Sequence, residues 1–156
     1  MLQPTPRRPG FREQYGIAEG PEGMVDWSWA DERLGASRNY WIVTADEDGR
    51  PRAAPVWGLW FDDSVVFSSH PQSRKGRNLA RDPRVVIHLD SGDEVVILEG
   101  EVEPAESTEE IAAAYESKYD WKPDVGSSDG WFRLRPRTAY AWTEADYPKS
   151  ATRFDF

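Results

Sequence analysis

Positive charge is concentrated in residues 68–84. This segment reads SSHPQSRKGRNLARDPR and holds five cations and one anion, in a chain of 156 residues whose formal net charge is −9. It follows an apolar run at residues 65–67. The pattern predicts a strand end, a turn and a short helix that begins near Ser73. Within that helix Gly76 costs about 1 kcal/mol of helix stability, so this segment contains a residue that is unfavourable for its predicted structure.

Arg74 and Lys75 would lie in the first turn of this helix, where positive charge is unfavourable. The first backbone amides of a helix are unpaired and its dipole is positive there, so each cation costs roughly 0.3–1 kcal/mol. A bound anion would remove this conflict. The segment is therefore predicted to anchor a phosphate or a carboxylate. The alternative interpretation is a solvated basic helix without a ligand.

Further donors and an apolar wall are predicted around this anchor. A helix would place Arg74, Asn78 and Arg81 on one side, because they are spaced i, i+4 and i+7. Nearby hydroxyl groups come from Ser68, Ser69 and Ser73. The neighbouring predicted strand offers an apolar wall for a flat ring system at Pro55, Val56 and Trp57.

Other kinds of functional centre find little support in the sequence. The chain has no cysteine and two histidines, His70 and His88, and neither histidine stands in a metal-binding spacing. The glycine motifs of dinucleotide and P-loop sites are absent, and so is the G-x-S-x-G nucleophile elbow. We therefore assign no catalytic side chain and no metal site. The acidic balance argues against a nucleic acid partner, although an interaction module that uses the basic segment is an alternative.

Short strands and turns dominate the rest of the chain. Strands are predicted at residues 40–44, 52–60, 64–69, 84–90, 94–102 and 132–143, and helices at 27–34, 73–81 and 107–119. Asp48-Gly49 and Ser91-Gly92-Asp93 indicate two hairpins. Because the helices are confined to connections, the fold class is mainly β, an antiparallel barrel and not an alternating βαβ sheet.

The length fits one domain. We expect an irregular N-terminal arm over residues 1–24, a central domain over 25–143 and a C-terminal tail over 144–156. The first residues lack the apolar stretch of a signal peptide or a membrane span, and no cysteine is present. These features favour a soluble cytoplasmic protein without a membrane partner.

Several motifs together resemble the pyridoxamine-5′-phosphate-oxidase-like superfamily of flavin and deazaflavin oxidoreductases, which are split β-barrels. The motifs are the run GRPRAAPV at residues 49–56, S-R-K-x-x-N-L-x-x-D-P from Ser73 to Pro83, and EGEV at residues 99–102. The resemblance covers about residues 27–143 and implies a homodimer with the cofactor in a cleft at the subunit interface. The sequence does not finish in the R-L-x-P of true pyridoxamine-phosphate oxidases, so vitamin B6 is not the expected substrate.

The resemblance also implies which residues bind the cofactor. Arg74 and Lys75 would hold its phosphate, with help from Ser68, Ser69 and Asn78. The strand from Arg52 to Trp57 would lie beside the ring, and Arg153 in the tail would reach the cleft. The full expected set is Arg52, Pro55, Val56, Trp57, Ser68, Ser69, Ser73, Arg74, Lys75, Asn78 and Arg153. Candidates for the substrate pocket are Trp57, Trp60 and Trp142.

The coenzyme that this reading favours is the deazaflavin coenzyme F420, with FMN as the alternative. The additional cations Arg77 and Arg81 suit its negatively charged polyglutamate tail. The expected activity is hydride transfer between the coenzyme and a small organic substrate, for which the coenzyme supplies the chemistry. Two alternatives remain: an FMN-dependent oxidase or reductase of the same fold, and a non-catalytic protein that binds a flavin, a deazaflavin or a tetrapyrrole.

Overall fold

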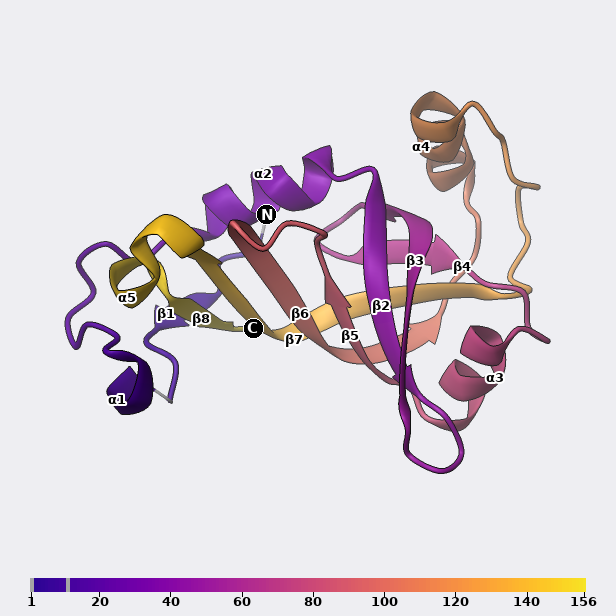
Figure 1. Ribbon diagram of the computed structural model, residues 1–156. Coiled ribbons are helices and arrows are strands. Elements are labelled where there is room, and N and C mark those ends of the chain that lie inside the picture. The colour runs from indigo at the N-terminus through magenta and orange to yellow at the C-terminus, as the bar shows by residue number, and fades with distance from the viewer. Residues whose placement is uncertain (1, 11) are drawn as a thin grey trace.

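A closed barrel of six antiparallel strands forms the body of the computed structural model, which describes residues 2–10 and 12–156 (Figure 1). Neighbours follow the order β7-β4-β3-β2-β5-β6, and β6 pairs with β7 to close the barrel. The predicted antiparallel split β-barrel, mainly β with few short helices, is confirmed. The barrel strands are β2 (Asn39–Ala45), β3 (Pro51–Trp60), β4 (Val65–Ser68), β5 (Arg84–His88), β6 (Glu94–Pro104) and β7 (Trp131–Thr143).

Alternation along the strands decides which side chains fill the barrel. In β2, Tyr40 and Ile42 are fully buried, whereas Trp41 and Val43 between them are partly exposed on the outer side. Strand β5 repeats the pattern, with Ile87 in the core and Val86 outside. The barrel therefore has a packed interior and an outer face that also carries large apolar groups.

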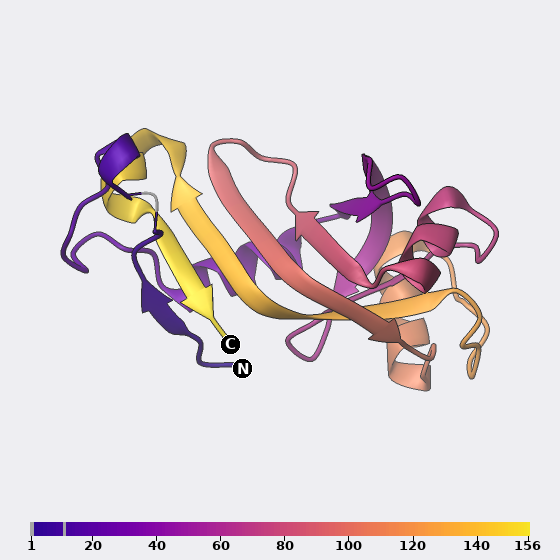
Figure 2. The ribbon, with the colours of Figure 1, turned by 90° about the horizontal axis from the view of Figure 1, so that it is seen from below.

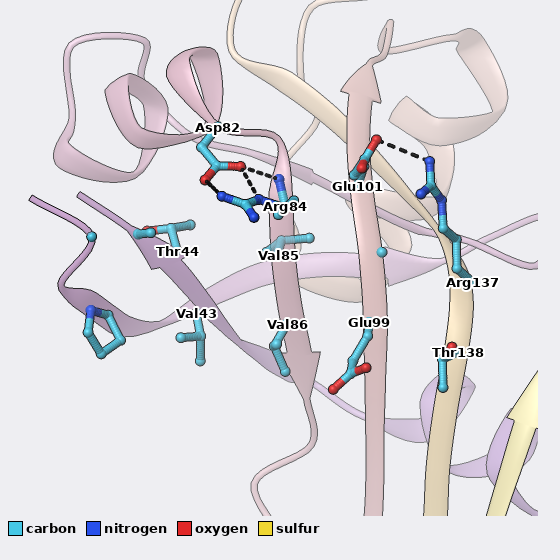
Figure 3. A pocket seen from close by; sticks show the side chains of 14 residues that line it. Val43, Thr44, Asp82, Arg84, Val85, Val86, Glu99, Glu101, Arg137 and Thr138 are labelled. Carbon is cyan, nitrogen blue, oxygen red and sulfur yellow. Dashed lines mark hydrogen bonds and ion pairs between the residues drawn. The ribbon is translucent and has the colours of Figure 1, made fainter. Parts of the chain in front are cut away.

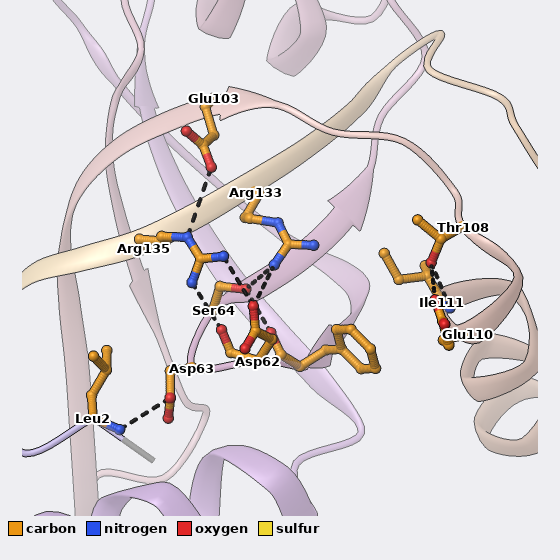
Figure 4. Close-up of polar contacts among 11 residues, drawn as sticks. Leu2, Asp62, Asp63, Ser64, Glu103, Thr108, Glu110, Ile111, Arg133 and Arg135 are labelled. Carbon is orange, nitrogen blue, oxygen red and sulfur yellow. Dashed lines mark hydrogen bonds and ion pairs between the residues drawn. The ribbon is translucent and has the colours of Figure 1, made fainter.

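The turn between β3 and β4 is tied to β7 by ion pairs (Figure 4). Asp62 Oδ2 lies 3.0 Å from Arg135 Nη2, and Arg133 Nη1 donates to Ser64 Oγ at 3.0 Å. The hydrogen bond from Arg135 lowers the pKa of Asp62. The backbone nitrogen of Leu2 also donates to Asp63 Oδ2 at 3.0 Å. The last of these contacts places Leu2 beside the turn.

Three longer helices cover the barrel: α2 (Trp27–Ala36), α3 (Arg74–Arg81) and α4 (Glu109–Tyr119). Helices α3 and α4 lie at the same end of the barrel (Figure 1). Helix α3 contributes Leu79 to the barrel core. Helix α4 packs Ile111 and Tyr115 against a second buried cluster that includes Leu59 of β3 and Val66 of β4. Both helices are thus fixed at the point where β4 ends.

The N-terminal segment, predicted as an irregular arm over residues 1–24, contains a strand and a short helix. Strand β1 (Thr5–Arg7) pairs with β8 (Thr152–Asp155), which itself pairs with β7 (Figure 2). Helices α1 (Arg12–Tyr15) and α5 (Tyr147–Ser150) and the turn η1 (Glu144–Asp146) lie at the same end. Arg8 donates to the carbonyl oxygens of four residues, Gly20, Glu22, Lys149 and Ala151. Two of these acceptors, Lys149 and Ala151, are 141 and 143 residues away in the sequence, which is why local patterns did not indicate these bonds.

Among the described residues, no helix combines the length and the apolar character that crossing a bilayer requires.

Candidate anion-binding site

Ser73 starts helix α3 as its N-cap. Its Oγ accepts a hydrogen bond from the backbone nitrogen of Gly76 at 3.1 Å and lies 2.9 Å from Ser69 Oγ. A Cβ atom on Gly76 would lie 2.4 Å from the carbonyl oxygen of His70. Glycine is thus required because the preceding turn packs directly on the helix. The predicted helix start is confirmed, and Gly76 has a packing reason that needs no ligand.

Arg74 and Lys75 are the two cations without a partner at this helix start. Arg74 is exposed and Lys75 is partly exposed, and within residues 2–10 and 12–156 neither side chain forms a hydrogen bond or an ion pair. Arg84, by contrast, is neutralised by Asp82 at 2.6 Å, and this contact lowers the pKa of Asp82 to about 2. The first turn of α3 therefore carries two uncompensated positive charges next to unpaired backbone amides.

The donors of the helix do not all point the same way, contrary to the spacing argument. Asn78 is 3% exposed, and its Nδ2 donates to Thr44 Oγ1 in β2 at 3.1 Å. Arg81 donates to the carbonyl oxygen of Ala45 at 2.7 Å. This side of α3 packs on the barrel, where a buried amide needs a partner. A contact between Asn78 and a phosphate stays a prediction.

The end of β4 and the start of β7 complete the surroundings of the helix start. Ser69 donates its backbone N–H to the carbonyl oxygen of Gly130 at 2.8 Å, and Ser68 is the register partner of Trp131. The last pair between β3 and β4 is Gly58 with Phe67. Trp57 precedes Gly58 in β3 and Ser68 follows Phe67 in β4, so both residues lie just beyond this pair. The structure therefore brings Trp57 to the same barrel end as the three serines.

Other members of the predicted set lie elsewhere. Val56 is buried in the core and Pro55 is exposed opposite Trp41. Arg52 pairs with Asp46 near the β2–β3 hairpin, at 3.0 Å. Arg153 lies in β8 at the far end of the barrel, where its Nε donates to Asp155 Oδ1 at 2.9 Å (Figure 1). Within one chain, Arg153 and Arg74 are not part of one site.

Two of the three tryptophans considered for a substrate pocket have other surroundings. The indole N–H of Trp60 donates to Asp31 Oδ1 at 2.8 Å, and Trp142 packs edge-on against Tyr147 at the end with α5. Trp57, in contrast, is 44% exposed at the end with α3. Of the three, Trp57 lies at the barrel end that carries the candidate site.

An open hollow of about 520 Å³ lies on the outer face of the barrel, and the sequence did not indicate it (Figure 3). It starts near the end of α3 and follows β2, β5, β6 and β7. Val43 and Val86 line its apolar part, and its two arginines are paired, Arg84 with Asp82 and Arg137 with Glu101 at 3.1 Å. Its cations are therefore neutralised, unlike Arg74 and Lys75, which lie outside it.

The donor set at the start of α3 fits a phosphate ester. It combines two free cations, backbone amides and the hydroxyl groups of Ser69 and Ser73, and a half-exposed indole lies at the same barrel end. Arg74 is exposed and Lys75 is partly exposed, so a single chain would bind such a group at its surface.

Known proteins resemble this chain in sequence and in fold. The family model described as "Pyridoxamine 5'-phosphate oxidase" matches residues 30–143. Two curated relatives, each named pyridoxine/pyridoxamine 5′-phosphate oxidase, come from Bradyrhizobium diazoefficiens and Acidothermus cellulolyticus. The first is 27% identical over 100% of this chain and 67% of its own length. The second is 34% identical over 72% of this chain and 50% of its own length. The chain thus spans about half to two thirds of these relatives.

Solved structures share the fold at low identity. The conserved hypothetical protein Rv2991 from Mycobacterium tuberculosis has a TM-score of 0.65 at 22% identity, over 77% of this chain and 86% of that chain. A structure named F420 reductase has a TM-score of 0.56 at 19% identity, and the match covers 70% of this chain and 94% of that chain. The family model spans all six barrel strands, from within α2 to the end of β7, and includes the start of α3. The chain belongs to the pyridoxamine 5′-phosphate oxidase family.

Proposed function

We propose that this protein is an oxidoreductase that binds the deazaflavin coenzyme F420 and acts on a small organic substrate. The observation that carries the proposal is the pair Arg74 and Lys75, two adjacent cations at a helix start without an anionic partner among the described residues. Family membership supports the redox function, and the F420 reductase with the same fold supports the coenzyme.

Each residue of the site has a defined task in this proposal. Arg74 and Lys75 bind the phosphate of the coenzyme, and the Ser69 and Ser73 hydroxyl groups donate further hydrogen bonds. Trp57 contacts the flat ring system. The bound coenzyme supplies the hydride chemistry, so the protein has to bind, orient and exclude water. No side-chain nucleophile is needed.

F420 is favoured over FMN by the remaining cations of α3. Arg77 and Arg81 donate to the carbonyl oxygens of Gln72 and Ala45, both at 2.7 Å. Carbonyl groups are neutral, so these two cations add to the positive potential that a polyglutamate tail would meet. FMN carries no such tail and remains the alternative coenzyme. A carrier that binds either coenzyme without turnover is the alternative function.

A second copy of the chain would complete the site. Arg74 and Lys75 are open to solvent in one chain, and the outer face of the barrel presents partly exposed apolar groups on neighbouring strands, Trp41, Val43, Val86 and Ile97. Packing of two such faces would bury apolar surface and create a cleft. We therefore include a homodimer in the proposal.

Equilibrium titration of the purified protein with F420 and with FMN tests the function. Wild type is expected to bind one of them with a dissociation constant of about 1 µM or below. Arg74→Ala and Lys75→Ala should each weaken it by about 1.5–3 kcal/mol, the usual contribution of a charged hydrogen bond. Lys149→Ala, which removes an exposed cation in α5 at the other end, is the matched control. Unchanged affinity in both site variants would reject the assignment.

A further inference from the structure

Lys118 and Arg38 are two cations that lie close together at the end of α4. Arg38 Nη1 donates to the carbonyl oxygen of Lys118 at 3.3 Å. The guanidinium carbon of Arg38 lies 5.1 Å from the centroid of the Tyr119 ring, and Lys118 Nζ lies 5.2 Å from the same centroid. The two positive charges therefore meet at one ring and repel each other.

Neither of these cations has an anionic partner in the part of the chain that the structure describes. Lys118 Nζ donates to the carbonyl oxygen of Gly58 at 2.7 Å, and it lies 4.9 Å from the centroid of the Tyr40 ring. Arg38 contacts the carbonyl oxygen of Lys118 and the Tyr119 ring. Carbonyl groups and rings are neutral, so they offset only part of the cost of removing an ammonium from water. A partly buried ammonium beside a second cation is therefore driven to lose its proton.

The amine of Lys118 is thus available as a nucleophile near neutral pH. Burial, and secondarily the charge of Arg38, lowers the pKa of Lys118 to about 8. A neutral amine still donates one N–H to the carbonyl oxygen of Gly58 and keeps its lone pair free. Desolvation and a neighbouring cation are the two means by which proteins activate a lysine for attack on a carbonyl carbon.

The missing anion selects carbon dioxide among the electrophiles that react with amines. An activated acyl group would convert Lys118 into a neutral amide and leave Arg38 without an anion. Carbon dioxide instead forms an N-carboxylate, which carries the negative charge that the surroundings lack. It is also small and uncharged, so it can reach a side chain that is only partly exposed.

We propose that Lys118 is a site of reversible carbamate formation with carbon dioxide, and that Arg38 pairs with the carbamate. The lone pair of Nζ forms a bond to the carbon of carbon dioxide, one C–O π bond opens onto its oxygen, and a proton of the nitrogen passes to water. Two cations that repel each other thereby become an ion pair. No atom of a coenzyme takes part, so the inference is independent of the proposed function.

Chemical trapping of the carbamate tests the inference. Coenzyme-free protein is equilibrated at about pH 8 with isotope-labelled bicarbonate, which supplies carbon dioxide, and is then treated with triethyloxonium, which converts carbamates into stable ethyl esters. Peptide mass spectrometry measures the label at each lysine of the chain, Lys75, Lys118, Lys122 and Lys149. Lys118 should carry about tenfold more label than exposed Lys149, because an ε-amine in water is almost entirely protonated at this pH. Equal labelling of these two lysines would overturn the proposal.

The role of Arg38 is tested by comparing two reactions of the same amine. Trace acetylation with acetic anhydride gives an uncharged product and reports how often Lys118 is neutral, whereas the carbamate label also depends on pairing. In Arg38→Met the carbamate label on Lys118 should fall about threefold further than the acetyl label, within the range of an exposed ion pair. Arg50→Met, which removes an exposed arginine between β2 and β3, should behave as wild type. An equal fall of both labels in Arg38→Met would reject the pairing.

Discussion

Lys118 is a partly buried amine at the end of α4. Its Nζ donates to the carbonyl oxygen of Gly58 at 2.7 Å and lies 4.9 Å from the centroid of the Tyr40 ring. Burial, and secondarily the charge of Arg38, lowers the pKa of Lys118 from 10.5 to about 8. Because Gly58 follows Trp57 in β3, this amine fixes the strand that carries Trp57.

The free energy of unfolding should rise between pH 8 and about pH 10 through Lys118. In that window the unfolded chain binds a proton that the folded chain has released, so increasing pH favours the folded state. Urea unfolding of wild type and Lys118→Met over this range measures the effect, and the variant should lack the rise. Above about pH 10 burial of Tyr40 acts in the opposite direction, because its pKa is raised. Parallel curves for the two proteins between pH 8 and 10 would contradict the assignment.

Residue types at the start of α3 were readable from the sequence, but their contacts were not. Ser73 is an N-cap because hydroxyl residues before a helix satisfy backbone amides, which is a local rule. The reason for Gly76 is the carbonyl oxygen of His70, and the partner of Asn78 is Thr44 in β2. Both contacts join the helix to residues outside it, and helical spacing alone does not describe such contacts.

At the scale of elements, a glycine packs the loop at residues 120–130 against Ser69, next to the candidate anion-binding site. Gly130 has a φ of 73°, and a Cβ atom there would lie 2.4 Å from the carbonyl oxygen of Ser69. Gly126 in the same loop also has a positive φ, 82°, but its nearest neighbour is the Glu106 carboxylate oxygen at 4.0 Å. A comparison of Gly126 and Gly130 therefore separates two contributions to the free energy of unfolding, backbone strain and steric clash.

Gly130→Ala should destabilise the protein more than Gly126→Ala. Both variants lose about 1 kcal/mol or more to left-handed backbone strain. Gly130→Ala must in addition displace the backbone of Ser69, so we expect a total of roughly 2–4 kcal/mol. Denaturant unfolding gives the two free energies, and coenzyme titration should show weaker binding for Gly130→Ala only. Equal stabilities of the two variants would show that the loop does not press on Ser69.

The elements themselves were largely predictable, and their long-range pairings were not. Alternating apolar residues and the Asp48-Gly49 turn were enough to predict β2, β3 and their hairpin. Strand β1 was missed because Thr5–Arg7 has no apolar alternation and pairs with β8 at the other end of the chain. The hollow beside Val43 and Val86 depends on how four strands curve, which no local pattern describes.

At the scale of the whole molecule, the outer face of the barrel predicts self-association. Strand pairing sets Trp41 beside His88 and His88 beside Ile97, so one row of mostly apolar side chains crosses β2, β5 and β6. All three are partly exposed in one chain. A face of this kind is typical of an interface.

Sedimentation equilibrium should give wild type twice the mass of the chain, and Ile97→Arg should shift it to the monomer. A buried charge without a partner costs several kcal/mol, which is enough to open an interface of ordinary size. Val125→Arg, which changes an exposed apolar residue in the loop at residues 120–130, is the control and should stay dimeric. A monomeric wild type, or a dimeric Ile97→Arg, would remove the outer face from the proposal.

The position of the coenzyme phosphate is the most direct measure of the central claim. A crystal structure of the protein with F420, or with FMN if that coenzyme binds, locates it. The phosphate oxygens are expected within hydrogen-bond distance of Arg74 and Lys75 at the start of α3. A phosphate bound instead in the hollow between Arg84 and Arg137, with the start of α3 facing solvent, would contradict the account.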